Sequence, residues 1–434
     1  MPPTNQIPQL FDLVMGNPPY VNIANIQDEK TRKYYQTHYK TVKNKSDLYS
    51  IFIERGISLL NDGGCLGYIV SNSWLGTDSF SEFRKFLLEN TRVMRLVKMP
   101  PDVFEDATVT PVILILKKEK VLGNHEIELV ECIDQQFEKM NHTLSYDRIR
   151  RTEGLTFSFE PEITFGAETV RLGDIAKFSL GIKTSNDQRF ILDQKIDNDC
   201  YPILRGRDIE RYGHSKSEKW IWYKPELMME KTGAGPRKLE YFLREKILFQ
   251  SITGGIIKAT IDTQKNLTND KVHILYELKE GWSLKFILGV VSSNLIGKWI
   301  RSSFGNLLEI KINNLQQLPI PKATTEQQTQ IAELVDKIIN LKKLSQDKIS
   351  QVNTYLEAKF QIKSTKKLQK LYELENAEFL SELTKQKAKI DLKTEAQLLD
   401  YFQTEKVDLL ELESQITQVD NQIEELVKGL YGLG

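Results

Sequence analysis

The sequence of 434 residues predicts an α/β domain, then a mixed α+β domain, then a helical C-terminal segment. Apolar runs alternate with helix-like segments from Phe11 to about Lys118, which is typical of an α/β sheet. The next stretch consists of short aromatic segments separated by turn signals. No glycine occurs between Gly305 and Gly429, which suits long helices. We therefore expect domains at residues 1–140, 165–323 and 324–434.

The first domain opens with an apolar run, Phe11 to Met15, that leads into a proline-rich loop and is predicted to be a buried strand. Ser46 and Asp47 offer an N-cap for a helix over residues 48–60, and the glycines after Asn61 are expected to end that helix with a left-handed turn. The segments that follow are a strand, a helix and two strands: CLGYIVSNS, FSEFRKFLLENT, RVMRLVKMP and VILILKK. We expect them to form a parallel sheet with right-handed crossovers.

The composition excludes several classes of protein. The longest purely apolar run, Val112–Leu116, is far shorter than the roughly 20 residues that span a bilayer, and the N-terminus lacks the pattern of a signal peptide. The three cysteines and five histidines are dispersed, so the sequence has neither a disulfide framework nor a zinc-finger spacing. We expect a cytoplasmic protein with no metal site and no membrane contact.

Charge is distributed unevenly, although 59 Lys and Arg balance 59 Asp and Glu over the whole chain. Residues 201–260 alone carry 12 basic and 7 acidic side chains. Such a local excess is either an ordinary solvated surface or an electrostatic footprint for a polyanion. Charge alone does not distinguish these two interpretations.

The C-terminal segment has helical periodicity. Thr324 or Thr325 can start a helix, because Glu326 and Gln327 follow at the spacing of a capping box. Apolar residues then recur in three stretches: Ile331, Leu334, Val335, Ile338, Leu341 and Leu344; Leu368, Leu371, Tyr372, Phe379 and Leu383; and Leu412, Ile416, Val419, Ile423, Leu426 and Leu430. Because the heptads are not continuous, we expect antiparallel packing within one chain rather than a dimeric coiled coil.

The most specific motif is Asn17-Pro18-Pro19-Tyr20, directly after the first strand. An asparagine side-chain oxygen and a backbone carbonyl can each accept one hydrogen of an exocyclic amine, which draws the nitrogen lone pair out of conjugation. Proline fixes the backbone and leaves its own carbonyl free, and the aromatic ring can stack on a flipped base. The alternative interpretation is a strand-ending turn with a half-buried tyrosine.

At this motif the sequence resembles the adenine-N6 DNA methyltransferases of the TaqI-like (gamma) class, which occur alone or within type IIG restriction-modification enzymes. SDLYSIFIERGISLLNDGGCLGYIVSNSWL and VFEDATVTPVILILKK look like the segments that follow the catalytic loop in that family. The resemblance implies the C-terminal half of a Rossmann-like methyltransferase sheet. It also implies S-adenosylmethionine as cofactor and no metal for methyl transfer.

The resemblance implies a catalytic loop made of Asn17, Pro18, Pro19 and Tyr20. Asn17 and the carbonyl of Pro18 would hold the target amine beside the cofactor, and Tyr20 would stack on the adenine opposite Phe104. Phe52 matches a family position that contacts the adenine of the cofactor. Phe104 and Phe52 also have an alternative interpretation as core side chains.

Residues 165–323 resemble a TaqI-like target-recognition domain through TVRLGDIAKFSLGIKTSNDQRFIL, YPILRGRDIERYG, ILFQSITGG and EIKINNLQQLPIPKATTEQQTQIAELV. The resemblance implies double-stranded DNA as the partner. It gives six cations a role in contacting phosphates or base edges: Lys183, Arg205, Arg207, Arg211, Lys216 and Lys258. Aromatic residues lie between these cations and favour nucleic acid as the ligand: Tyr201, Tyr212, Trp220, Trp222 and Tyr223.

Two features of this family are expected before the catalytic loop. They are an F-x-G-x-G loop that cradles S-adenosylmethionine and an acidic residue that holds its ribose. Only sixteen residues precede Asn17, too few for a strand, loop and helix. We therefore expect a missing or separate N-terminal half to carry the cofactor loop, and no nuclease domain in this chain.

Other functions remain open at this point. A DNA-binding specificity protein with a silent catalytic loop would explain why the cofactor loop is absent from the sequence. An enzyme that methylates a protein glutamine or an rRNA guanine would also use Asn-Pro-Pro-Tyr, although such enzymes rarely carry so long a recognition region. Cytosine-N4 methylation is disfavoured, because its usual loop begins with Ser or Asp.

Overall fold

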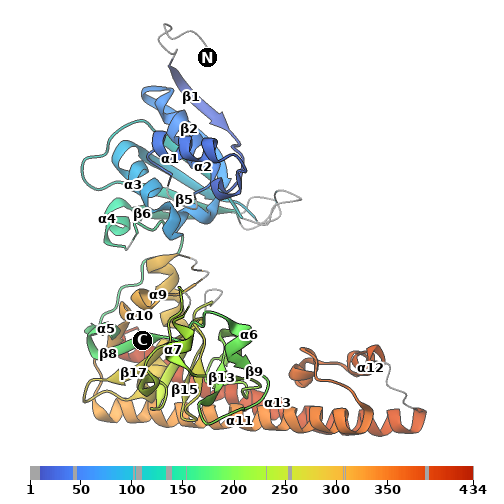
Figure 1. Cartoon of the computed structure of the whole chain (residues 1–434). Coiled ribbons are helices and arrows are strands. Elements are labelled where there is room, and N and C mark those ends of the chain that lie inside the picture. The colour runs from blue at the N-terminus through green and yellow to red at the C-terminus, as the bar shows by residue number, and fades with distance from the viewer. Residues whose placement is uncertain are drawn as a thin grey trace. The chain divides into compact units, whose positions relative to one another are not determined.

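The computed structural model describes residues 10–42, 46–100, 103, 110–132, 139–152, 154–230, 232–252, 257–305, 307, 309–386 and 391–433 (Figure 1). The chain forms two compact units. The first unit comprises Met1–Ile163 and Lys298–Leu308, and the second comprises Thr164–Gly297 and Glu309–Gly434. The second unit therefore contains both the expected recognition domain and the helical segment, and a boundary between these two at residue 323 stays a prediction.

The first unit is built on one mixed sheet with the strand order β1-β2-β4-β3-β5-β6. The strands are β1 Phe11–Gly16, β2 Leu60–Ser71, β3 Arg92–Lys98, β4 Pro111–Lys117, β5 Glu126–Cys132 and β6 Lys139–Ser145. β1 runs parallel to β2, whereas β4 lies antiparallel between β2 and β3. The prediction of a wholly parallel sheet is therefore wrong at β4, because residues 99–110 join β3 to β4 by a short connection that favours antiparallel neighbours.

Four α-helices of the first unit lie within the described residues: α1 Glu29–His38, α2 Leu48–Ser58, α3 Ser81–Asn90 and α4 Tyr146–Arg151. Asp47 is the N-cap residue of α2, as predicted. The helix ends at Ser58, before the glycines, so the predicted glycine exit is wrong. Gly63 instead adopts φ +80° inside β2, at the point where its register with β1 shifts.

The first strand is more exposed than its apolar sequence predicts. The exposed fractions of Phe11, Leu13 and Met15 are 46%, 54% and 73%, so the prediction of a buried strand is wrong. By contrast, β2 buries Leu66 completely, in one core with the inner faces of α2 and α3. β1 has one hydrogen-bonded neighbour among the described strands, which leaves its outer edge open.

The second unit contains two four-stranded sheets, β15-β14-β17-β8 and β16-β10-β13-β9, and two two-stranded sheets, β11-β12 and β18-β7. The strands are β7 Thr169–Arg171, β8 Ala176–Leu180, β9 Ile191–Leu192, β10 Cys200–Leu204, β11 Ile209–Glu210, β12 Gly213–His214, β13 Trp220–Trp222, β14 Lys246–Gln250, β15 Ala259–Asp262, β16 Leu267–Thr268, β17 Val272–Leu278 and β18 Pro319–Pro321. The intervening helices are α5 Leu172–Ile175, α6 Asp187–Phe190, α7 Pro225–Met228, α8 Leu284–Val291 and α10 Ile312–Gln316. The helix α9, Asn294–Phe304, begins in the second unit and continues from Lys298 into the first.

A long helical hairpin completes the second unit. α11 spans Thr325–Phe360 and α13 spans Leu392–Leu430, and the two lie side by side in Figure 1. Thr324 and Gln327 form the predicted capping box. The helices are antiparallel within one chain, as predicted, because Ser345 contacts Glu413 while Lys348 contacts Glu405.

The far end of the hairpin has a core of its own. The six-residue 3-10 segment Leu368–Glu373 and the helix α12, Asn376–Lys385, pack there between α11 and α13. Phe379 stacks on Phe402 of α13 with ring centroids 4.2 Å apart. The predicted apolar stripe of α11 is buried at most positions, but Leu344 is 56% exposed.

Candidate functional site

The Asn17–Tyr20 loop begins at the carboxyl end of β1, where β1 and β2 run parallel. Asn17 and Pro19 are exposed, Pro18 is buried and Tyr20 is half-buried. The buried proline anchors the turn and leaves the asparagine amide open to a ligand. The carboxyl edge of a parallel strand pair is the usual place for a ligand in α/β folds.

The chain after this loop is held against the start of α2. The Ile23 N–H donates to the Ser46 carbonyl and the Leu48 N–H donates to the Val21 carbonyl, each at 2.9 Å. Asn22 and Asp47 pair as an antiparallel bridge between these two bonds. The residues of the Asn17–Tyr20 loop are therefore held at one end by β1 and at the other by the start of α2.

The ring of Tyr20 packs edge-on against Tyr49, with centroids 6.3 Å apart and an interplanar angle of 81°. Tyr49 is fully buried and stacks on Phe80 at 5.5 Å. Burial raises the pKa of Tyr20, so its ring stays neutral at physiological pH. Its hydroxyl is buried without a hydrogen-bond partner among the described residues.

A row of hydrogen-bonded polar side chains lies beside Tyr20, and the sequence does not indicate these contacts. The row consists of Asn22, Asp47, Tyr49 and Ser73. Asp47 does not cap α2 with its side chain but bonds to the side chains of Asn22 and Tyr49. The Tyr49 hydroxyl lies 3.0 Å from the Ser73 hydroxyl. Burial raises the pKa of Asp47. From the sequence, Asp47 is already explained as the start of a helix. Nothing in the sequence therefore indicates that its side chain has other partners.

The two phenylalanines implied by the resemblance have different outcomes. Phe104 lies outside the described residues, so its role stays a prediction. Phe52 projects from α2 with 45% of its surface exposed, although its neighbours Ile51 and Ile53 are buried. The alternative of a plain core side chain is therefore wrong for Phe52, and its ring is open to a flat ligand.

Two of the six predicted DNA-contacting cations meet in the second unit. Lys183 and Arg205 line one cavity of about 440 Å³ together with residues 184–187, Asn269 and Asp270. Arg207 projects from the adjacent turn with 74% of its side chain exposed. Lys216 and Lys258 are exposed as well. These five cations remain candidates for contacts to a polyanion.

Arg211 is the exception and corrects the sequence interpretation. Its guanidinium forms ion pairs with Asp420 and, at 3.1 Å, with Glu424, and it donates to the Ser292 carbonyl at 2.7 Å. It also lies 4.9 Å from the ring centroid of Tyr212. Arg211 is therefore bound within the protein, where it links the recognition region to α13, and is not free to bind a phosphate.

The aromatic residues between these cations are also structural. Tyr212 is fully buried, and Tyr201, Trp222 and Tyr223 pack against the core of the second unit. The Trp222 indole donates to Asp197 at 2.7 Å, and the Tyr223 hydroxyl donates to the Arg237 carbonyl at 2.5 Å. Full burial makes the prediction of a nucleic-acid contact wrong for Tyr212, whereas for the half-buried Tyr201, Trp222 and Tyr223 it stays a prediction.

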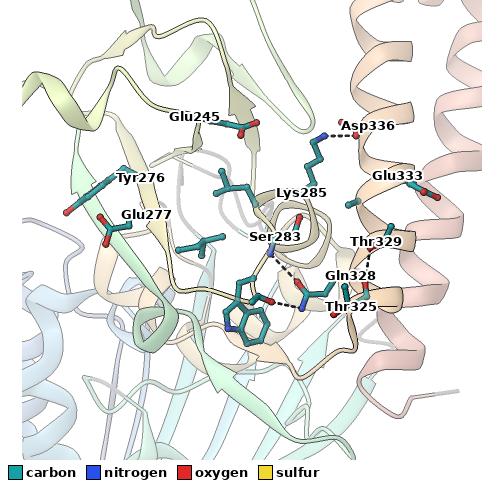
Figure 2. A pocket seen from close by; sticks show the side chains of 15 residues that line it. Glu245, Tyr276, Glu277, Ser283, Lys285, Thr325, Gln328, Thr329, Glu333 and Asp336 are labelled. Carbon is teal, nitrogen blue, oxygen red and sulfur yellow. Dashed lines mark hydrogen bonds and ion pairs between the residues drawn. The ribbon is translucent and has the colours of Figure 1, made fainter.

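A larger cavity, of about 800 Å³, lies where the loop before α8 meets α11 (Figure 2). Four carboxylates line it: Glu245, Glu277, Glu333 and Asp336. Lys285 pairs with Asp336 at 2.6 Å, and Gln328 bonds to the Ser283 N–H and the Gly281 carbonyl. The excess of carboxylates repels phosphates, so this cavity is unsuited to DNA.

Two negative findings concern the described part of the chain. Residues 10–433, apart from the gaps given above, include no group of three or more His, Cys, Asp or Glu placed to hold a metal ion. Within the same ranges, every helix is too short or too polar to cross a membrane.

Three segments of the chain match models of known protein families. Residues 3–104 match the model of the Eco57I restriction-modification methylase, and residues 201–320 match the TaqI-like C-terminal specificity domain. Residues 324–427 match a domain of unknown function, DUF8810. Over these segments the chain is similar to restriction-modification methyltransferases and to their specificity domains. The resemblance predicted from the sequence is confirmed to that extent.

Two relatives show how much of the chain is shared. The type II restriction enzyme and methyltransferase RM.Eco57I of Escherichia coli is 34% identical over 119 residues, 27% of this chain and 12% of that protein. The type II methyltransferase M.BstVI of Geobacillus stearothermophilus is 38% identical over 125 residues, 28% of this chain and 21% of that protein. The matches thus cover less than a quarter of either relative.

The fold has a solved counterpart. The structure of the type IIL restriction-modification enzyme MmeI, in complex with DNA, matches 97% of this chain and 54% of that chain with a TM-score of 0.57. The sequence identity is 11%, so this likeness concerns the fold alone. The methylase match contains Asn17 and Phe52, and the specificity match contains Arg205 and Arg207, whereas Lys183 precedes it.

Proposed function

We propose that this chain supplies the catalytic loop and the DNA-specificity region of a site-specific adenine-N6 methyltransferase in a restriction-modification system. The observation that carries the proposal is the exposed amide of Asn17, at the carboxyl end of β1 and inside the matched methylase segment. The specificity-domain match supports double-stranded DNA as the substrate. A DNA substrate in turn places the protein in the cytoplasm.

The loop residues suit the chemistry of an aromatic amine. The Asn17 side-chain oxygen and the Pro18 carbonyl would each accept one hydrogen of the adenine N6 amine, which turns the nitrogen lone pair out of the ring plane. That lone pair would form the new N–C bond as the S–CH3 bond of the sulfonium breaks, with S-adenosylhomocysteine as the leaving group, and one amine proton would then leave to solvent. Tyr20 would hold the flipped base by stacking, a role that needs a neutral ring such as this one.

S-adenosylmethionine, when bound, supplies the methyl group. The exposed ring of Phe52 fits a stacking contact with the flat adenine of that cofactor. Asn17 would also lie close to the methyl donor, because it holds the acceptor nitrogen. Asn17 and Phe52 are the two described side chains that we assign to the cofactor. Binding of the cofactor would need further contacts from other residues.

We propose that those contacts come from a polypeptide that carries the cofactor-binding half of the methyltransferase sheet. The open edge of β1 and the exposed side chains of Leu13 and Met15 support this partner. An apolar strand with an unpaired edge is a template for pairing with another strand. A strand added beside β1, with helices over both faces, would bury these side chains.

The test combines this chain with the cofactor-binding half of a related methyltransferase, tritiated S-adenosylmethionine and mixed-sequence duplex DNA. We expect tritium in N6-methyladenine only when this chain is present. Asn17→Ala should reduce incorporation by roughly 100-fold or more, as for loss of one group that stabilises a transition state. Asn25→Ala, at an exposed asparagine just after the loop, is the matched control and should stay active.

Three outcomes would contradict the proposal. Sequence-selective DNA binding without methyl transfer would favour a specificity protein with a silent loop. Label in N4-methylcytosine would change the target base. Label in a protein glutamine or an rRNA guanine, in parallel reactions with those substrates, would change the substrate class.

A further inference from the structure

The cavity that contains Arg205 and Lys183 is built on a rigid frame in the second unit. The Gly181 N–H donates to the Val272 carbonyl at 2.9 Å, and the Ile182 N–H donates to the Thr268 carbonyl at 2.7 Å. A Cβ atom at Gly181 would lie 1.9 Å from the Asn269 carbonyl oxygen. Only glycine therefore allows the two loops that form the cavity wall to approach so closely.

Backbone bonds also hold the two segments that carry the cations of the cavity. Lys183 and Gly235 exchange two bonds, at 3.2 and 2.8 Å, and the Arg205 N–H donates to the Asp208 carboxylate at 2.7 Å. These contacts fix the backbone at both cations. Precise positioning of this kind is what a site that discriminates between similar ligands requires.

Most polar groups on the wall are already used by the protein. The Thr184 hydroxyl donates to Asp187, the Asn186 side chain accepts from the Arg189 N–H at 3.3 Å, and the Asn269 side chain accepts from the Lys271 N–H at 3.3 Å. Two cations and two carboxylates on the wall have no ion-pair partner among the residues that the structure describes: Lys183, Arg205, Asp187 and Asp270. Asp187 already accepts from the Thr184 hydroxyl, so the cavity offers a ligand two cationic donors and, in Asp270, a carboxylate acceptor.

This combination suits the edge of a base pair better than a phosphate. Asp187 and Asp270 offset the two cations, and a carboxylate beside a phosphate is repulsive. In the major groove, guanine presents the N7 and O6 acceptors that Arg and Lys bind, and cytosine presents the N4 amine that Asp accepts. A G·C pair is the base pair that satisfies both kinds of group at once.

We propose that the Arg205–Lys183–Asp270 cavity reads one G·C base pair of the recognition site. Arg205 and Lys183 contact the guanine, and Asp270 accepts from the cytosine amine. Arg207, which is largely exposed on the neighbouring turn, contacts the DNA backbone instead. This inference rests on the proposed DNA-specificity function and names the residues that determine one position of the site.

The experiment measures DNA binding by the full chain, which needs no methyl transfer. Duplexes with randomised sequence are selected by wild type, and affinities for every single-base change of the preferred site are then measured at several salt concentrations. We expect Arg205→Ala to reduce discrimination at one G·C position by roughly 5- to 150-fold while preferences at other positions persist. Asp270→Asn should relax the same position.

Arg207→Ala is the matched control. It should weaken binding to all sequences alike and reduce the slope of log K against log salt by about 1, without changing the preferred site. Arg205→Lys guards against loss of folding, since it keeps the charge; discrimination at the G·C position should still fall, because a lysine lacks the bidentate fork. Replacing the guanine by 7-deazaguanine should cost wild type more affinity than it costs Arg205→Ala, in which Lys183 alone still contacts the guanine.

Two results overturn the inference alone. One is that Arg205→Ala weakens all sequences uniformly and lowers the salt slope, which would make the cavity a phosphate site. The other is an unchanged sequence preference in both Arg205→Ala and Asp270→Asn. If wild type binds DNA with no sequence preference, the proposed specificity function fails together with this inference.

Discussion

The two units differ in how completely they bury their own side chains. In the first unit an apolar strand, β1, leaves Leu13 and Met15 more than half exposed and one edge unpaired among the described strands. In the second unit even charged groups are enclosed, since Lys246 and Asp262 are both fully buried as a pair. β1 of the first unit thus exposes an apolar strand edge, whereas the paired strands β14 and β15 of the second unit enclose even a charged pair.

The largest expected effect concerns the enclosed ion pair of the second unit. Asp262 accepts from Lys246 and from the N–H groups of Gln264 and Asn266. Asp262→Ala leaves a buried ammonium without its counter-ion and should lower the free energy of unfolding by about 3–5 kcal/mol. Urea unfolding followed by circular dichroism measures this. A loss below about 1 kcal/mol would show that the second unit is less enclosed than the structure indicates.

Substitutions of two leucines in the first unit compare the exposed strand β1 with the buried core around β2. Leu66→Ala on β2 creates a cavity and should cost about 2–5 kcal/mol, because Leu66 is fully buried. Leu13→Ala on β1 should change the stability of the chain by no more than about 0.5 kcal/mol. The same unfolding measurement, repeated with the proposed cofactor-binding partner, should make Leu13→Ala costly; equal effects in both conditions would argue against that partner.

Arg211 offers a test that depends on pH. Burial raises the pKa of Glu424, so its ionised form costs stability at neutral pH and Arg211 offsets part of that cost. Arg211→Ala should therefore destabilise the chain by about 2–3 kcal/mol near pH 7. The loss should shrink as pH falls from the raised pKa of Glu424 down to the ordinary range of a glutamate, because the protonated carboxyl needs no counter-charge. A loss that is constant from pH 7 to pH 4 would contradict this account.

The smallest expected effect is at Tyr20. Its buried hydroxyl has no partner among the described residues, so Tyr20→Phe removes an unsatisfied group and should leave stability unchanged or raise it by up to about 1 kcal/mol. The ring and its edge contact with Tyr49 are retained, so stacking and methyl transfer should persist. Thermal unfolding measures the stability of the variant, and the tritium assay measures its methyl transfer. A large loss of methyl transfer would instead assign the hydroxyl a role in the reaction.

The features that the sequence predicts well are local. The strand before the Asn17–Tyr20 loop, the Asp47 start of α2 and the Thr324 capping box each depend on residues within a few positions of one another. The features that it misses depend on distant partners. Arg211 meets Asp420, which lies 209 residues further along the chain, and no periodicity or spacing indicates that meeting. The exposure of β1 is likewise invisible, because an apolar run does not show whether anything covers it.

The ion pairs of Arg211 with Asp420 and Glu424 of α13 have a consequence for exchanging the proposed DNA-specificity region between such proteins. A recombination event, or a designed chimera, that replaces residues 164–320 alone would leave Asp420 and Glu424 facing whatever side chain the donor carries at position 211. Two carboxylates that lose their guanidinium repel each other in a half-buried setting. We therefore expect a chimera that exchanges residues 164–320 to keep its stability only when the helical hairpin of α11 and α13 is exchanged with them.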